Sequence, residues 1–161
     1  MPTVRQIYGQ RALEIVRRHC PCVSCLERKW KFVGGEQRGV DLQCIGCGRF
    51  AESKGQFLGT RLSLGVPNDI PGASYRVWLQ QLFQGHNVDL YFTRWTNDGN
   101  FVVRGIRAEL RPPEFMLPRA ILTGPRAGYV LLKIRLSLLD PGIFPILAQH
   151  QEPAKRVRLL A

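Results

Sequence analysis

The stretch "VDLQCIGCGRFAESK", residues 40–54, decides how this sequence is interpreted, because it places two kinds of metal chemistry side by side. At its centre is a Cys-x-x-Cys pair, Cys44 and Cys47, whose thiolates suit a soft metal. Asp41 precedes the pair and a Glu-x-Lys, Glu52 and Lys54, follows it. Carboxylates suit a hard metal such as Mg²⁺. The segment therefore predicts two metal sites with different functions.

A second Cys-x-x-Cys pair, Cys22 and Cys25, lies upstream, and residues 26–43 separate it from Cys44. A gap of two residues lets both sulfurs of a pair turn toward one ion, and two such pairs supply the tetrahedral thiolate shell that zinc prefers. Four thiolates close that shell. The spacing therefore predicts a structural Zn²⁺ that holds the fold and does no chemistry of its own.

Cys20 is a further possible ligand, since Cys20-Pro-Cys22 offers another thiolate close to the first pair. Two interpretations are open: Cys20 replaces Cys22 in the zinc shell, or it is a free buried thiol, which is the favoured one. Disulfide or redox chemistry for the cysteines is a weaker alternative, because no export signal points to an oxidising compartment.

If the chain folds back at the second cysteine pair, a hairpin centred near Gly46 and Cys47 sets Asp41 opposite Glu52. Facing Cβ atoms on such strands are about 5 Å apart. Residues two apart on a strand share a face, so Lys54 should lie beside Glu52. The zinc clip would thus fix the register that brings two carboxylates together.

Two facing carboxylates repel each other unless a cation joins them, and Mg²⁺ is commonly held by one or two carboxylates plus phosphate and water. A lysine beside them can position a water molecule or stabilise a phosphate. Asp41, Glu52 and Lys54 therefore form a candidate catalytic site for phosphodiester hydrolysis. The alternative is an ordinary surface ion pair, because Glu-x-Lys is common.

The composition points to a polyanionic partner. The chain has 161 residues, 23 Lys and Arg against 12 Asp and Glu, and a formal net charge of +11. Such a basic domain usually contacts nucleic acid. The first residues lack the apolar run of a secretory signal, and charged residues and prolines break the most apolar stretch, residues 129–148. We expect a cytoplasmic protein without a membrane segment.

The pattern along the chain predicts one domain, residues 1–161, of mixed α/β (α+β) class, with a mixed β-sheet flanked by helices. Helices are expected at 3–18 and 74–85, and an Asp-Gly turn at 96–100 should join the strands 88–95 and 101–110. The remaining expectations are strands at 28–33, 39–44 and 129–139, an extended segment at 49–64, a loop at 68–74, a proline-rich segment at 111–128 and a mobile basic tail at 150–161.

At these residues the sequence resembles the catalytic domain of DpnI-type restriction endonucleases, members of the PD-(D/E)XK nuclease superfamily. The resemblance rests on two Cys-x-x-Cys pairs, an Asp three residues before the second pair, and a Glu-x-Lys that ends ten residues after its first cysteine. The positions are Cys22, Cys25, Asp41, Cys44, Cys47, Glu52 and Lys54. Later segments, including "PRAGYVLLKIRLSLL", are also similar, so the resemblance covers most of the chain.

The resemblance implies a PD-(D/E)XK core with an embedded zinc ribbon, and Mg²⁺ held by Asp41, Glu52 and the Ser53 carbonyl. It places Tyr129 as an aromatic wedge in the DNA duplex, Arg126 near a phosphate or base, and Gln10 near the site. The family cuts double-stranded DNA that carries N6-methyladenine in a GATC context, and it adds a winged-helix domain that this chain is expected to lack.

We therefore expect a Mg²⁺-dependent, methyl-directed DNA endonuclease that is a monomer or a transient dimer on DNA. Two alternatives are open: a zinc-ribbon nucleic-acid-binding module without catalysis, and a PD-(D/E)XK nuclease with a different DNA target.

Overall fold

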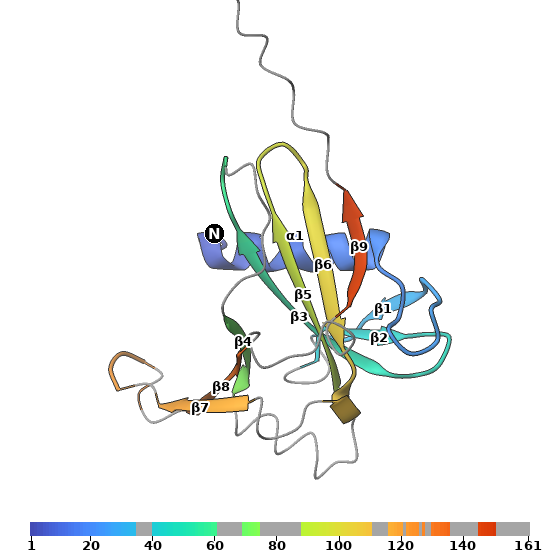
Figure 1. Cartoon of the computed structure of the whole chain (residues 1–161). Coiled ribbons are helices and arrows are strands. Elements are labelled where there is room, and N and C mark those ends of the chain that lie inside the picture. Colours follow the sequence, from blue (N-terminus) through green and yellow to red (C-terminus); the bar gives the residue numbers. More distant parts are fainter. Residues whose placement is uncertain are drawn as a thin grey trace, which may run out of the picture.

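The computed structural model shows a mixed β-sheet with one helix across it and a second, small sheet beside it (Figure 1). The structure describes residues 1–34, 40–60, 69–74, 88–110, 116–120, 122–125, 127, 130–135 and 145–150. The predicted helix at 74–85 lies outside these ranges except for its first residue, and all but the first residue of the predicted basic tail lies outside them as well.

Helix α1 (Val4–His19) confirms the first predicted helix. It begins with a capping box, in which the Gln6 N–H donates to the Thr3 hydroxyl and the Thr3 N–H donates to the Gln6 side chain. It ends on the basic residues Arg17, Arg18 and His19, which suit the negative end of the helix dipole.

The main sheet has six strands in the order β1-β2-β3-β5-β6-β9. All neighbouring strands are antiparallel except β3 and β5, which are parallel and pair from Phe50–Val88 to Phe57–Trp95. The mixed sheet confirms the expected α/β class. Its strands are β1 (Trp30–Phe32), β2 (Leu42–Cys44), β3 (Phe50–Phe57), β5 (Val88–Trp95), β6 (Phe101–Ile106) and β9 (Ile146–His150).

The core lies between α1 and one face of this sheet. The helix packs closely on Gly55, because a Cβ built there would lie 2.5 Å from the Ala12 Cβ and 2.7 Å from the Trp95 ring. The buried cluster on this face consists of Ala12, Ile15, Val16, Cys20, Leu42, Ala51, Tyr91, Trp95, Phe101 and Val103. Since side chains alternate along a strand, Glu52 and Lys54 lie on the opposite face from α1.

The predicted hairpin at 88–110 is confirmed in its strands and its turn, but β6 is shorter than expected. In the turn, the Thr96 N–H donates to the Asn100 carbonyl over 3.0 Å, and Gly99 adopts a φ of +80°. The chain leaves the strand after Ile106 and forms a short 3₁₀ helix, η1 (Ala108–Leu110). The Ala108 N–H donates to Asp89 Oδ1 over 2.8 Å, which turns the chain back over β5.

The second sheet has the order β4-β8-β7 and corrects one prediction. Residues 68–74 were expected to form a loop, but β4 (Asp69–Ser74) pairs with β8 (Val130–Arg135), itself a predicted strand. β7 (Met116–Ala120) pairs with the other side of β8. Pro71 and Pro118 both lie on edge strands, the positions in a sheet that tolerate a residue without an N–H. Pairing with β8 therefore overrides the turn propensity of this segment.

Strand β9 is a further correction, because His150 was expected to begin a mobile tail. Instead, His150 is the last residue of β9 (Ile146–His150) and pairs with Phe101 of β6. No described helix is both long and apolar enough to cross a membrane.

Candidate functional site: a cysteine cluster beside an acid pair and a lysine

The four predicted zinc ligands come together. The ligand atoms of Cys22, Cys25, Cys44 and Cys47 all lie within 4.8 Å of one another. The Cys22–Cys47 Sγ distance is 3.7 Å and the Cys25–Cys44 Sγ distance is 3.5 Å. A tetrahedron with Zn–S bonds of about 2.3 Å has edges of about 3.8 Å, so the donor set fits one tetrahedral zinc ion.

The chemistry of the thiols also fits a cation. Burial raises the pKa of Cys22 and of Cys44, so these groups would hold their protons without a positive charge nearby. Backbone N–H groups of the turn act in the other direction, and the Glu27 N–H lowers the pKa of Cys25. A bound Zn²⁺ would displace the remaining protons and balance the thiolates.

Cys20 stays outside the cluster, which agrees with its interpretation as a free thiol. It is fully buried in the core beneath α1, its Sγ lies 3.5 Å from the Pro21 carbonyl, and burial raises its pKa strongly. The alternative in which Cys20 replaces Cys22 is not what the structure shows.

The second cysteine pair forms the turn of the β2–β3 hairpin. The Cys44 N–H donates to the Arg49 carbonyl, and the Gly48 N–H donates to the Cys44 carbonyl, both over 2.8 Å. Beyond the turn, Leu42 pairs with Ala51 and Gln43 with Phe50. At the next position the pattern changes: the Asp41 N–H donates to the Ala51 carbonyl over 2.9 Å, so Asp41 lies beside β3 close to the predicted position, and the strand pairing does not extend to Asp41 and Glu52.

Asp41 reaches β3 with its side chain. β2 begins at Leu42, and just before it the Ser53 N–H donates to Asp41 Oδ2 over 2.8 Å, where a backbone carbonyl would otherwise continue the ladder. Ser53 lies between Glu52 and Lys54 in β3. Burial raises the pKa of Asp41, while the Ser53 N–H and the positive charge of Lys54 partly oppose that rise. Asp41 is thus a half-buried carboxylate within the electrostatic reach of Lys54.

Glu52 and Lys54 form an ion pair on the face of the sheet that α1 does not cover. The Lys54 Nζ lies 2.9 Å from Glu52 Oε1, and the exposed fractions of the two side chains are 35% and 7%. A buried carboxylate needs a positive partner, because removing its charge from water is costly. Lys54 supplies that partner, and the structure brings all three predicted catalytic residues to one place.

Two arginines share this face and were not singled out from the sequence. Phe92 of β5 pairs with Lys54 of β3 on one side and with Arg104 of β6 on the other, so Lys54 and Arg104 belong to one row across the sheet. Arg94 follows in the next row, opposite Gln56. Both arginine side chains are half-buried, and burial lowers the pKa of Arg104. Arg94 follows Phe92 by two residues and Arg104 follows Val102 by two, so each arginine shares a face with an apolar residue. This pattern does not mark either arginine as a site residue in the sequence.

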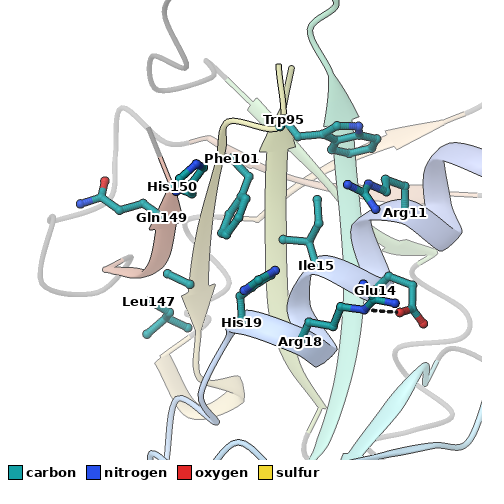
Figure 2. A pocket seen from close by; sticks show the side chains of 12 residues that line it. Arg11, Glu14, Ile15, Arg18, His19, Trp95, Phe101, Leu147, Gln149 and His150 are labelled. Atoms are coloured by element: carbon teal, nitrogen blue, oxygen red, sulfur yellow. Dashed lines mark hydrogen bonds and ion pairs between the residues drawn. The ribbon is translucent and has the colours of Figure 1, made fainter. Parts of the chain in front are cut away.

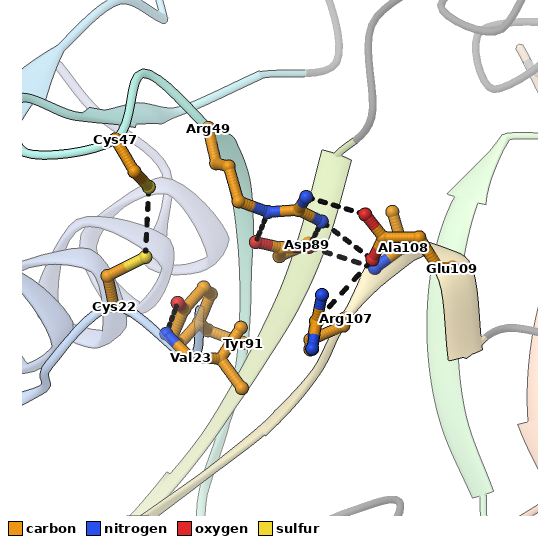
Figure 3. Close-up of polar contacts among 9 residues, drawn as sticks. All are labelled: Cys22, Val23, Cys47, Arg49, Asp89, Tyr91, Arg107, Ala108 and Glu109. Carbon is orange, nitrogen blue, oxygen red and sulfur yellow. Dashed lines mark hydrogen bonds and ion pairs between the residues drawn. The ribbon is translucent and has the colours of Figure 1, made fainter. Parts of the chain in front are cut away.

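Two anchors tie the cysteine cluster to the sheet (Figure 3). Near the first cysteine pair, the Val23 N–H donates to the Tyr91 hydroxyl over 2.8 Å. Next to the second pair, Arg49 donates to Asp89 Oδ2 over 2.9 Å and to Oδ1 over 2.6 Å, and the same guanidinium contacts Glu109. Asp89 is only 1% exposed. The carboxylate oxygens of Asp89 and Glu109 raise the pKa of Arg49, which therefore stays charged.

Of the predicted DNA contacts, Gln10 is not brought to this site. Gln10 is exposed on α1, the helix that covers the other face of the sheet from Glu52 and Lys54. Arg126 and Tyr129 lie outside the described residues.

No protein-family model matches the chain, and a search of curated proteins finds no match.

Proposed function

We propose that this protein is a Mg²⁺-dependent endonuclease that hydrolyses phosphodiester bonds of double-stranded DNA at Asp41, Glu52 and Lys54. The observation that carries the proposal is the convergence of these three residues: one hydrogen bond holds Asp41 to the backbone between the other two, which are themselves ion-paired. The turn at Cys44–Cys47 and the pairing of β2 with β3 bring the three residues together, so the arrangement depends on the cysteine cluster.

The donor chemistry suits Mg²⁺. Asp41 engages one oxygen, Oδ2, with Ser53, which leaves Oδ1 for a cation. Glu52 supplies a second carboxylate, and we assign the Ser53 carbonyl as a third oxygen ligand. Hard oxygen donors of this kind, completed by water and phosphate, are what Mg²⁺ prefers. When bound, the ion would polarise the scissile phosphate and favour ionisation of a nearby water molecule.

The protein residues have separate roles in this proposal. Lys54 is the catalytic cation: its ammonium group, now on Glu52 Oε1, is close enough to hold an attacking water molecule or to stabilise the charge that develops on the phosphate. Asp41 and Glu52 position the metal. The burial of Glu52 limits its rotamers, which favours a fixed geometry for the reaction.

The DNA would be held on the face of the sheet opposite α1. Arg104 extends the row of Lys54 across this face, Arg94 lies in the next row, and the whole chain carries a net charge of +11. Neutralisation of backbone phosphates supplies sequence-independent affinity, which depends strongly on salt. The chain would act as a monomer, or as a transient dimer that cuts both strands.

We further propose that the substrate carries N6-methyladenine in a GATC-like context, as in a cytoplasmic restriction enzyme of the DpnI type. Seven residues that keep both their type and their spacing in the sequence support this narrower assignment. The experiment is a digest of plasmid DNA from hosts with and without adenine methylation at GATC, with Mg²⁺ present. Cutting of the methylated plasmid alone is expected. Equal cutting of both would refute the methyl dependence and leave a nuclease with another DNA target.

A second candidate is a zinc-ribbon module that binds nucleic acid without catalysis. The ion pair between Lys54 and Glu52 favours it, because it satisfies both groups without any metal. Absence of cleavage with Mg²⁺ or Mn²⁺ on every duplex tested, together with DNA binding that is unchanged in an Asp41→Asn variant, would establish this candidate over the first.

A further inference from the structure

A pocket of about 550 Å³ lies on the opposite side of the sheet from Glu52 and Lys54, between the second half of α1 and the strands β6 and β9 (Figure 2). Its volume falls in the range of about 300–1,000 Å³ that is typical of small-molecule sites. Buried and partly buried apolar side chains form its floor, while charged and polar side chains of α1 and β9 form its rim. The floor consists of Ile15, Trp95, Phe101, Leu147 and Ala148.

Three aromatic rings form a ladder along one wall. The ring centroids of His19 and Phe101 are 4.9 Å apart with an interplanar angle of 33°, and those of Phe101 and His150 are 6.2 Å apart at 35°. The two histidines are exposed, whereas Phe101 is buried between them. Figure 2 shows the three rings lining the side of the pocket between α1 and β9. Such a set of tilted, partly open rings suits a flat aromatic ligand.

Two arginines lie along the α1 side of the pocket. The Nε of Arg18 is 3.2 Å from Glu14 Oε2, and Glu14 also pairs with Arg17. Arg11 makes no ion pair within the part of the chain that the structure describes, so its charge is open to a ligand. Arg11 lies two helical turns before His19 and thus away from the negative end of the helix dipole. An anion is better tolerated at Arg11 than at that end.

We propose that this pocket binds a phosphorylated nucleoside, with the base against the rings of His19, Phe101 and His150 and the phosphate on Arg11. The spacing of the parts supports this orientation, because the rings gather at the His19 end of α1 and the unpaired cation lies toward its middle. This site is separate from the candidate catalytic residues and does not depend on the proposed nuclease activity. The ligand is either a free nucleotide or a nucleotide of a single strand, since both present the same chemistry.

The experiment is isothermal titration calorimetry of the full zinc-loaded chain, without added Mg²⁺, using deoxyadenosine 5′-monophosphate, deoxyadenosine and a 5′-phosphorylated single-stranded tetranucleotide. The monophosphate should bind at least tenfold more tightly than the nucleoside. Arg11→Gln should remove most of that difference. Lys31→Gln, which removes the same charge from an exposed position on β1, should change the affinity less than twofold. His150→Ala should weaken both the nucleoside and the nucleotide.

Tighter binding of the tetranucleotide than of the monophosphate would identify a strand as the ligand, and equal binding would identify the free nucleotide. No binding of any of the three, or equal losses in Arg11→Gln and Lys31→Gln, would overturn the proposal. Melting temperatures of the variants near the parent value ensure that a loss of affinity is not a loss of fold. Asp41→Asn should leave this binding unchanged, which separates the pocket from the candidate nuclease site.

Discussion

The Ser53 N–H donates to the side chain of Asp41 across the β2–β3 hairpin, over 2.8 Å, so a carboxylate takes the place of a backbone carbonyl just before β2 begins. One oxygen of Asp41, Oδ2, therefore accepts a hydrogen bond from the backbone, and Oδ1 has no donor among the residues that the structure describes. This division of roles makes it possible to remove the charge of Asp41 without removing its structural hydrogen bond, and that distinction underlies the first prediction.

Asp41→Asn should abolish cleavage and keep the fold. The asparagine Oδ1 still accepts from the Ser53 N–H, but the neutral amide is a poor ligand for a divalent cation. We expect at least a hundredfold loss of Mg²⁺-dependent cleavage, measured on supercoiled plasmid, with little change in melting temperature. Asp98→Asn is the matched control, because Asp98 is exposed in the β5–β6 turn and should lose no activity. Asp41→Ala should also destabilise the protein, by about 1–3 kcal/mol, because it leaves the Ser53 N–H without its acceptor.

Mg²⁺ itself should stabilise the folded protein if the two carboxylates hold it. A ligand that binds only the folded state raises the melting temperature in proportion to the logarithm of its concentration above Kd. We expect a rise with increasing Mg²⁺ in the parent protein and none in the double variant Asp41→Asn/Glu52→Gln. This measurement needs no DNA. An equal rise in both proteins would place the ion elsewhere and count against the proposed metal site.

The hairpin was predictable from sequence because its causes are local. Two cysteine pairs that meet in one cluster fix the turn at Cys44–Cys47, and the turn then fixes which residues of β2 and β3 pair. The Asp98-Gly99 turn is local in the same sense. β4 and β9 were not predictable, because strand formation there depends on partners far along the chain, β8 and β6, and overrides proline and polar residues.

The clamp formed by Arg49, Asp89 and Glu109 was missed for the same reason. Asp89 and Glu109 are 40 and 60 residues from Arg49 in the sequence, so no short pattern joins the three. One signal was available: Asp89 is an acid in an otherwise largely apolar strand, where a buried charge must find a partner. That Arg94 and Arg104 share the candidate nuclease face with Lys54 likewise becomes visible only when the register of β3, β5 and β6 is known.

Gly55→Ala should destabilise the protein because α1 rests directly on this residue. The added methyl group would lie 2.5 Å from the Ala12 Cβ, closer than side chains approach, so the helix would have to shift. Overpacking of this kind costs about 1–3 kcal/mol. Gly9→Ala is the matched control: nothing lies within 4 Å of the added group, and the same substitution inside a helix should stabilise by about 0.5–1 kcal/mol. Urea denaturation followed by circular dichroism measures the free energy of unfolding of both variants. A change of the same sign in both would contradict this account of the packing.

Arg49→Ala should destabilise the protein more than the double variant Arg49→Ala/Asp89→Asn. The single change leaves the carboxylate of Asp89, which is 1% exposed, without its positive partner, and such a loss costs about 3 kcal/mol or more. The double variant also removes the unpaired negative charge of Asp89 and should recover part of the lost stability. Arg107→Ala is the control: its side chain is 47% exposed and lies 3.6 Å from Glu109, so its removal should cost under about 1 kcal/mol. If the double variant is the less stable of the two, the clamp does not act through charge compensation.

Zinc removal should unfold the hairpin and end cleavage together, because the cysteine cluster holds the turn that brings the Asp41 side chain to the Ser53 N–H, next to Glu52. Cys25→Ser should lose the single bound zinc, measured by native mass spectrometry, and should lose both the melting transition and the activity. Cys20→Ala tests whether this depends on the cluster rather than on cysteine in general. Cys20 is buried in the core and outside the cluster, so this variant should keep its zinc and its activity while losing some stability to the cavity it creates. A folded, active protein after complete loss of zinc would show that the β2–β3 register needs no metal.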